Sequence, residues 1–267
     1  MDLQLEARRA LVTGGSRGIG LAVAAQLVAE GAHVVIAARD ATRLGAAAER
    51  LREDRPGAVV VPVAVDTGDD ESVRGLVDTT VGVLGGVDIL VNAAAVPGGS
   101  APPPKLPELT DDLFWDDVNV KVLGYLRCAR EVAPHMAAQG WGRIVNVSGL
   151  AARQTGSIIG SIRNVAVAAA TKNLADELGP SGINVTVVHP GLTRTEGVLE
   201  RLAAVADRRG LSLEEVEAEM ASTTSSRRVV DAEEVAWVVA FLASPRSVAI
   251  NGDAIVVSGG ARGSIHY

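Results

Sequence analysis

The chain has 267 residues, 48% of them hydrophobic, and carries a formal net charge of −7. A chain of this length and composition can bury the core of one α/β domain. The acidic balance argues against a nucleic-acid-binding surface, and no basic run exists because there are only three lysines, Lys105, Lys121 and Lys172. We therefore expect a small-molecule partner and no nucleic acid.

Cys128 is the only cysteine, which excludes an internal disulfide and gives no reason to expect an oxidising compartment. Residues 1–6 lack the basic and apolar regions of a signal peptide, and no apolar run approaches the roughly 18 residues of a membrane span. We therefore expect a cytoplasmic protein with no membrane partner. A metal hydrolase is not expected either, because the histidines have no ligand spacing: His33, His135, His189 and His266.

A glycine-rich turn lies between a predicted strand and a predicted helix near the start of the chain. Residues 10–12 are apolar, residues 13–20 have the sequence TGGSRGIG, and residues 21–28 carry apolar side chains at helical spacing. Glycine lets the backbone turn tightly and lets a phosphate approach closely, and the start of a helix offers free N–H groups. This order of strand, turn and helix predicts a dinucleotide site at Gly14, Ser16, Arg17, Gly18, Ile19 and Gly20.

The rest of the chain alternates between short apolar stretches and amphipathic ones. Fully apolar strands that alternate with helices predict a parallel sheet covered on both faces. We expect a Rossmann-like, doubly wound α/β fold of about seven strands that spans residues 1–267 as one domain. The strands are predicted at residues 10–12, 33–38, 59–65, 87–91, 143–147, 183–189 and 253–257. Further helices are predicted at residues 40–52, 71–84, 111–139, 161–178 and 231–242.

Two segments interrupt this alternation. Residues 97–107 are rich in Pro, Gly and Ser, which is typical of a surface loop. Residues 192–228 are polar, with short helical patches that mix apolar and charged side chains. We expect both segments to cover the site, with residues 192–228 as a substrate lid. A plain helical insertion at the surface is the alternative for that second segment.

Residues just after the strands are candidates for cofactor binding, because doubly wound sheets bind ligands at the carboxyl ends of their strands. Asp66 and Thr67 follow the third strand and suit an adenine edge, or alternatively cap the next helix. Asn92 follows the fourth strand, before three alanines that let a cofactor lie close. The turn after the sixth strand offers backbone and hydroxyl groups from Pro190, Gly191, Thr193 and Thr195.

The end of the second strand indicates which dinucleotide is bound. An acidic residue there would bind the ribose 2′-hydroxyl of NAD, whereas an arginine nearby accommodates the 2′-phosphate of NADP. Ala38 occupies the expected acidic position, Arg39 follows it, and Arg17 lies in the glycine turn. These residues predict NADP(H) in preference to NAD(H), unless Arg39 merely begins a solvated helix.

Six motifs in order resemble those of the short-chain dehydrogenase/reductase family, over nearly the whole chain. The resemblance implies a Rossmann-like fold, an NAD(P) cofactor, and hydride transfer between nicotinamide and a carbonyl or alcohol. The motifs are the glycine turn at 13–20, Asp66, Asn119 within DVNV, the strand RIVNVS at 143–148, Pro190-Gly191, and the ending NGDAIVVSGG at 251–260.

The resemblance breaks at the family's proton-transfer pair, a Tyr-x-x-x-Lys motif on the helix after the fifth strand. Residues 171–178 resemble the downstream part of that helix. Counting back without a gap places Gly160 at the tyrosine position and Asn164 at the lysine position. Glycine has no acidic group, and a neutral amide cannot shift a pKa by charge. The sequence therefore predicts a degenerate active site.

Two residues that match the family's other catalytic positions remain as candidates, Asn119 and Ser148, although Ser148 can instead serve only to hydrogen-bond its turn. At 100° per residue of an α-helix, Lys121 and Tyr125 point away from Asn119, so we expect neither to replace the missing acid. Arg163 borders the altered face and can hold an anionic group, but it cannot deliver a proton.

We expect an oxidoreductase whose carbonyl, imine or enone substrate needs little protonation by the protein. The alternative is a non-redox protein that keeps the dinucleotide site, either a cyclase or lyase or a regulatory pseudoenzyme. The predicted helix at 111–139 has more apolar surface than one sheet face needs, and the family resemblance implies a homotetramer or homodimer.

Overall fold

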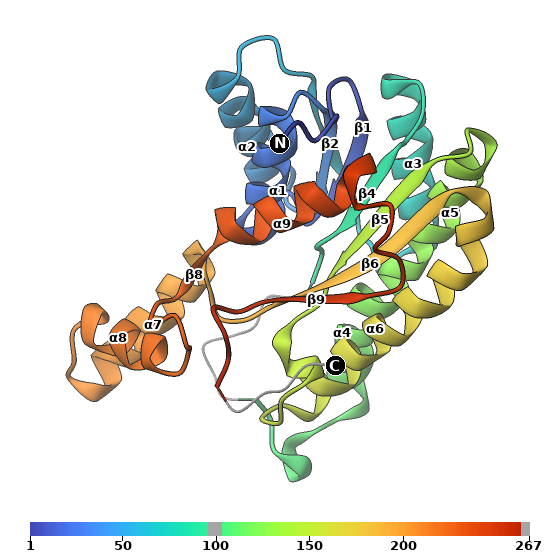
Figure 1. Ribbon diagram of the computed structural model, residues 1–267. Coiled ribbons are helices and arrows are strands. Elements are labelled where there is room, and N and C mark those ends of the chain that lie inside the picture. Colours follow the sequence, from blue (N-terminus) through green and yellow to red (C-terminus); the bar gives the residue numbers. More distant parts are fainter. Residues whose placement is uncertain (96–102, 263–267) are drawn as a thin grey trace.

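The computed structural model has a seven-stranded parallel sheet with helices on both faces (Figure 1). It describes residues 1–95 and 103–262, so part of the predicted covering loop, residues 97–102, and His266 lie outside the described residues. The strands are β1 (Arg9–Thr13), β2 (His33–Ala38), β3 (Val60–Ala64), β4 (Ile89–Asn92), β5 (Gly142–Val147), β6 (Ile183–Pro190) and β9 (Ala254–Val257).

The strand order is β3-β2-β1-β4-β5-β6-β9, and every neighbouring pair is parallel. The predicted Rossmann-like, doubly wound sheet is therefore confirmed. The order reverses between β1 and β4, which leaves a crevice beyond their carboxyl ends. The strands β5 and β6 are buried at every position, as a sheet covered on both faces requires.

Three helices pack on each face of the sheet, and each set buries its own apolar core. On one face lie α1 (Gly18–Ala29), α2 (Ala41–Asp54) and α9 (Ala232–Ala243). On the other lie α3 (Asp70–Leu84), α5 (Gly124–Ala138) and α6 (Ile158–Leu178). Short 3₁₀ turns occur at Leu106–Glu108, Leu150–Ala152, Gly179–Ser181 and Pro245–Ser247.

The helix predicted over residues 111–139 is divided by a π-helical turn. It begins as α4 (Asp111–Val118), continues as a π-helix (Asn119–Leu123) and then becomes α5. The N–H of Gly124 donates to the carbonyl of Asn119, which is the i→i+5 bond that defines the π-helix. The structure is thus helical over nearly all of the predicted stretch, but its middle turn is π-helical, which the sequence pattern does not indicate.

A small helical unit follows β6, within the segment predicted to cover the site. It contains α7 (Glu196–Arg209) and α8 (Leu213–Ser222), which lie to one side of the sheet (Figure 1). The short strands β7 (Thr193–Arg194) and β8 (Val230–Asp231) pair at its base. Its own apolar cluster contains Val198, Leu202, Ala206 and Val216. Among all described helices, none is long and apolar enough to cross a membrane.

Candidate active site

A cavity of about 1090 Å³ lies at the carboxyl ends of the strands, beside α7. The glycine turn after β1 lines it together with the residues that follow β4, β5 and β6. This is the crevice where doubly wound sheets bind ligands. Most of the predicted cofactor residues line it: Gly14, Ser16, Arg17, Gly18, Ile19, Gly20, Arg39, Thr67, Pro190, Gly191, Thr193 and Thr195.

At two positions of the glycine turn, neighbouring backbone atoms leave no room for a side chain. A Cβ on Gly20 would lie 2.2 Å from the carbonyl oxygen of Gly14. A Cβ on Gly14, where φ is +70°, would lie 2.6 Å from the carbonyl oxygen of Ala93. The first residue of α1 is Gly18, so the N–H groups at the positive end of this helix face the cavity. The turn therefore fits a diphosphate, as predicted.

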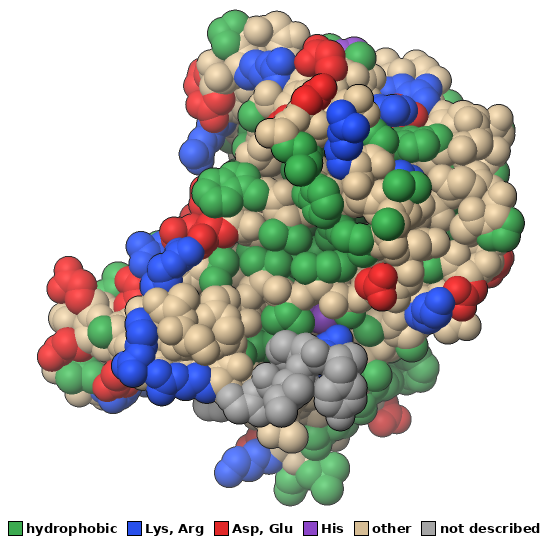
Figure 2. All heavy atoms as spheres, viewed as in Figure 1, with side chains coloured by type: hydrophobic (Ala, Val, Ile, Leu, Met, Phe, Trp, Pro, Cys, Tyr) green, Lys and Arg blue, Asp and Glu red, His purple; other side chains and the backbone are tan. Residues whose placement is uncertain are grey.

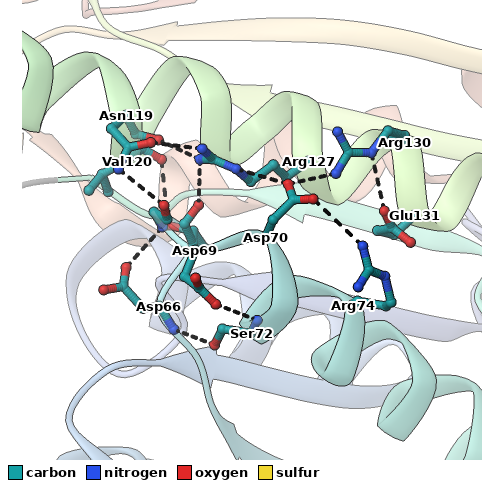
Figure 3. A network of polar contacts seen from close by, with 12 residues as sticks. Asp66, Asp69, Asp70, Ser72, Arg74, Asn119, Val120, Arg127, Arg130 and Glu131 are labelled. Atoms are coloured by element: carbon teal, nitrogen blue, oxygen red, sulfur yellow. Dashed lines mark hydrogen bonds and ion pairs between the residues drawn. The ribbon is translucent and has the colours of Figure 1, made fainter.

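Two predicted cofactor residues do not line the cavity. The Asn92 side chain is fully buried and donates to the Asn146 Oδ1 at 3.0 Å, so it joins β4 to β5. The carboxylate of Asp66 folds back to accept the Gly68 N–H at 2.9 Å (Figure 3). Both side chains are held by local polar contacts, which position in the sequence does not predict. The structure thus does not place either side chain against a cofactor in this cavity.

Three arginines line the cavity near the end of β2. Arg17 and Arg39 were predicted, and Arg43 is added by the structure. Arg43 lies in the first turn of α2, and Arg39 lies just before the Asp40 cap of that helix, so the start of the helix brings both beside the end of β2. Asp40 caps α2 by accepting the Arg43 N–H at 3.0 Å. The guanidinium groups make this end of the cavity suitable for a phosphate.

The other end of the cavity holds a buried ammonium group. Lys121 lies in the π-helix, is 5% exposed, and lines the cavity. Its Nζ donates to the backbone carbonyl of Ser148, at the end of β5, at 2.9 Å. Burial lowers the pKa of Lys121 from 10.5 to about 7, and repulsion from Arg163 acts in the same direction. Attraction to Asp117 opposes these effects in part.

The prediction that Lys121 stays out of the site is wrong. Asn119 and Lys121 do point in different directions, but it is Lys121 that lines the cavity, whereas Asn119 joins a polar network with Gly68 and Arg127 (Figure 3). The Asn119 amide donates to the Gly68 carbonyl at 3.1 Å, and its Oδ1 accepts from Arg127 at 2.9 Å. The helical count correctly separates these two side chains, but it cannot tell which of the two sides lines the cavity. The Asn119 side chain therefore does not line the cavity, and its candidate catalytic role stays a prediction.

Ser148 lines the cavity, and its hydroxyl is within hydrogen-bonding distance of the side-chain oxygen of Asn164 (3.1 Å) and the Asn164 carbonyl (3.2 Å). Asn164 also lines the cavity and is buried. Gly160 lies in the first turn of α6, where a Cβ would be 2.8 Å from the Ser157 Oγ that caps the helix. Tyr125 is buried outside the cavity and donates to the Val147 carbonyl at 2.9 Å.

Arg163 reaches the cavity from α6 and forms an ion pair with Asp117 of α4. Both side chains are largely buried. The pair ties α4 to α6 and engages the carboxylate of Asp117. In residues 1–95 and 103–262, no tyrosine lines the cavity. The groups around its inner end are thus an amine, a hydroxyl, an amide and a guanidinium.

A family model described as enoyl-(acyl carrier protein) reductase matches residues 14–262. The chain belongs to the short-chain dehydrogenase/reductase family. One relative of this short-chain dehydrogenase/reductase is the short-chain reductase protein NovJ of Streptomyces niveus, 36% identical over 255 residues, or 94% of this chain and 92% of NovJ. Another is the NADPH-dependent reductase BacG of Bacillus subtilis, 29% identical over 264 residues, or 97% and 99% of the two chains.

Solved structures resemble this short-chain dehydrogenase/reductase over nearly its full length. L-Sorbose reductase from Gluconobacter frateurii, complexed with NADPH and L-sorbose, has a TM-score of 0.93 and 30% sequence identity. That comparison covers 99% of this chain and 100% of the other. The actinorhodin polyketide ketoreductase with NADPH has a TM-score of 0.88 and 32% identity, over 98% and 99% of the two chains.

Proposed function

We propose that this short-chain dehydrogenase/reductase is an NADP(H)-dependent oxidoreductase that transfers a hydride to or from a small organic carbonyl, imine or enone. The observation that carries the proposal is one cavity with two chemically different ends. A glycine turn and three arginines lie at one end, and a buried lysine beside Ser148 lies at the other. Relatives named as reductases, and similar structures complexed with NADPH, support this assignment.

Different residues of the chain would bind different parts of the cofactor. The N–H groups of the glycine turn would hold the diphosphate, and Arg17, Arg39 and Arg43 would bind the 2′-phosphate. Thr67 would lie near the adenine, and the turn from Pro190 to Thr195 would contact the nicotinamide half. When bound, NADPH supplies the hydride, while these residues fix its orientation and exclude water.

We also propose that Gly160 and Asn164 occupy the positions of the family's tyrosine and lysine. The finding that no tyrosine lines the cavity in the described part of the chain supports this. Asn164 keeps a polar contact with Ser148, but a neutral amide offers no charge to a neighbouring acid. The reaction therefore needs another proton source, or a substrate that needs none.

Consumption of NADPH with a substrate panel tests the proposed function. The panel should contain simple ketones, cyclic iminium ions and activated enones, followed at the nicotinamide absorbance band. We expect steady NADPH oxidation with at least one class. A Gly20→Ala variant should lose this activity, because its Cβ would collide with the backbone of the same turn. Tight NADPH binding with no oxidation across the panel would instead indicate the non-redox alternative.

The covering segment and the quaternary structure complete the proposal. We propose that residues 1–267 act as one cofactor-binding domain, with residues 192–228 as the lid over substrate. Helix α7 lines the cavity, which supports this.

We further propose a homodimer or homotetramer. Figure 2 shows hydrophobic side chains gathered around α9 and β9, where Trp237 and Val248 are exposed. A second apolar area on α6 contains Ile158, Ile162 and Val165.

A further inference from the structure

We propose that Lys121 is the catalytic proton donor of this enzyme, and that its Nζ takes the place of the missing tyrosine hydroxyl. The inference rests on the proposed hydride transfer and names the residue that completes it. It is built on the position of Lys121 in the cavity and on the chemistry of its neighbours.

The ammonium of Lys121 is held in place by a hydrogen bond and still has N–H donors for a substrate. Its Nζ has a hydrogen bond to the Ser148 carbonyl, and an ammonium has three N–H donors. Among the described residues, no carboxylate lies within 4.0 Å of this Nζ. Donors therefore remain for a substrate oxygen or nitrogen that enters the cavity beside Ser148. The hydrogen bond to the Ser148 carbonyl holds Lys121 on the cavity side, while Asn119 on the other side of the turn donates to Gly68.

The surrounding charges explain why this lysine can give up a proton near neutral pH. Burial in the cavity wall disfavours the charged form, and the guanidinium of Arg163 adds repulsion. Asp117 would stabilise the ammonium, but its carboxylate is paired with Arg163. The resulting pKa of about 7 is in the range where a group both donates and regains a proton efficiently.

The groups packed around Lys121 are less suited to act as the proton donor. Arg163 stays charged at any physiological pH. The Ser148 hydroxyl is engaged with Asn164, and burial raises the pKa of Tyr125 while its hydroxyl bonds the Val147 carbonyl. Asp117, the carboxylate whose charge acts on Lys121, is in the ion pair described above.

The proposed step balances for a carbonyl substrate. The carbonyl carbon accepts a hydride, with its two electrons, from the reduced nicotinamide. The electron pair of the C=O π bond moves to oxygen, and an N–H bond of Lys121 breaks as the new O–H bond forms. The substrate leaves as an alcohol, the cofactor leaves oxidised, and the neutral amine regains a proton from water. The reverse reaction uses the neutral amine as a base.

Nuclear magnetic resonance on the free wild-type protein tests the chemistry without any turnover. The chain has only three lysines, so labelling the ε-carbons with ¹³C gives three signals, and a Lys121→Gln variant assigns one of them. We expect the Lys121 signal to titrate near pH 7. Addition of NADP⁺ should shift the Lys121 signal selectively. Titration of Lys121 near its ordinary value, or no response to NADP⁺, would overturn the proposal.

Kinetics of matched variants separates proton donation from charge alone. Lys121→Arg keeps the positive charge but cannot release the proton, whereas Lys121→Gln loses both. We expect both variants to bind NADPH with nearly wild-type affinity and to lose about 10²–10⁴-fold in kcat at neutral pH. Lys172→Gln is the control, since Lys172 is exposed on α6 and pairs with Asp176. Wild-type kcat for reduction should fall about tenfold per pH unit above the pH at which Lys121 is half protonated.

Two kinetic outcomes would contradict the assignment. Full activity in Lys121→Arg would mean that only charge is needed, and a weakened NADPH affinity with unchanged kcat would make Lys121 a cofactor ligand. Failure of the proposed function itself would look different. In that case wild-type protein would not oxidise NADPH at all, while the titration of Lys121 would remain as measured in the free protein.

Discussion

At the scale of single residues, Lys121 destabilises the fold that contains it. Moving its pKa from 10.5 to about 7 means that the folded protein disfavours the ammonium relative to the unfolded chain. Each pKa unit corresponds to about 1.4 kcal/mol, so the effect is on the order of a few kcal/mol. Strongly shifted pKa values cluster at functional sites, which agrees with the place of Lys121 in the cavity.

A Lys121→Met variant should therefore be more stable than wild type, by a few kcal/mol at pH 6, on the same order-of-magnitude scale. Below pH 7 both states of the wild type hold the proton, so the penalty is fully present. Between about pH 7 and 10.5 the unfolded chain holds more protons than the folded one, so wild-type stability rises with pH. Urea unfolding from pH 6 to 9 measures this, and a stability difference that does not shrink as pH rises would contradict it.

The glycine turn gives a second prediction for single residues. Gly20→Ala should abolish measurable NADPH binding, because its Cβ would lie 2.2 Å from a backbone oxygen that cannot move without opening the turn. Gly45→Ala is a matched control in α2, where no atom lies within 4 Å of the added Cβ. That variant should bind NADPH normally and gain up to about 1 kcal/mol of stability. Calorimetric titration of both variants checks the pair.

At the scale of elements, the sequence predicts the regular parts of this molecule well. The apolar strands, their alternation with helices and the glycine turn all follow from local pattern, and the sheet forms as expected. The exception is the π-helix at Asn119–Leu123. Nothing in the spacing of apolar residues distinguishes it from an α-helix. Only tertiary contacts show that the side of this turn with Lys121, and not the side with Asn119, lines the cavity.

The predicted cofactor-binding residues also differ in how well the sequence predicts them. Backbone positions such as Gly14 and Gly191 were predictable because strand ends and turns fix them. The side chains of Asn92 and Asp66 were not, since each satisfies a local partner, Asn146 and Gly68, that only tertiary contact brings near. Sequence therefore predicts where the backbone of a site lies better than where its polar side chains point.

Helix α7, which lines the cavity, gives a prediction at this scale. Its first residue, Glu196, accepts the N–H of Gly18 at 3.2 Å, where the diphosphate would bind. A negative charge at the start of α1 is favourable by about 0.3–1 kcal/mol, so this carboxylate competes with the cofactor. Glu196→Gln should bind NADPH roughly two- to fivefold more tightly. Glu214→Gln on α8 is the control, and weaker binding by the Glu196 variant would show instead that Glu196 contacts bound cofactor.

At the scale of the whole molecule, the exposed apolar area on α6 predicts self-association. Ile158, Ile162 and Val165 are spaced by four and three residues, so they share one face of the helix, and each is about half exposed. We expect sedimentation at micromolar concentration to show a dimer or tetramer. Ile162→Glu should lower the assembly state, while Val83→Glu on α3, also at an exposed position, should not. A monomeric wild type would contradict the proposed oligomer.

The proposed activity requires that NADP(H) bind in the cavity between the glycine turn and Lys121. Calorimetric titration of the wild-type protein with NADPH and, separately, with NADH tests this most directly. We expect saturable binding of one NADPH per chain, and weaker binding of NADH because Arg17, Arg39 and Arg43 lack their phosphate partner. No heat with either nucleotide, or tighter binding of NADH, would contradict it.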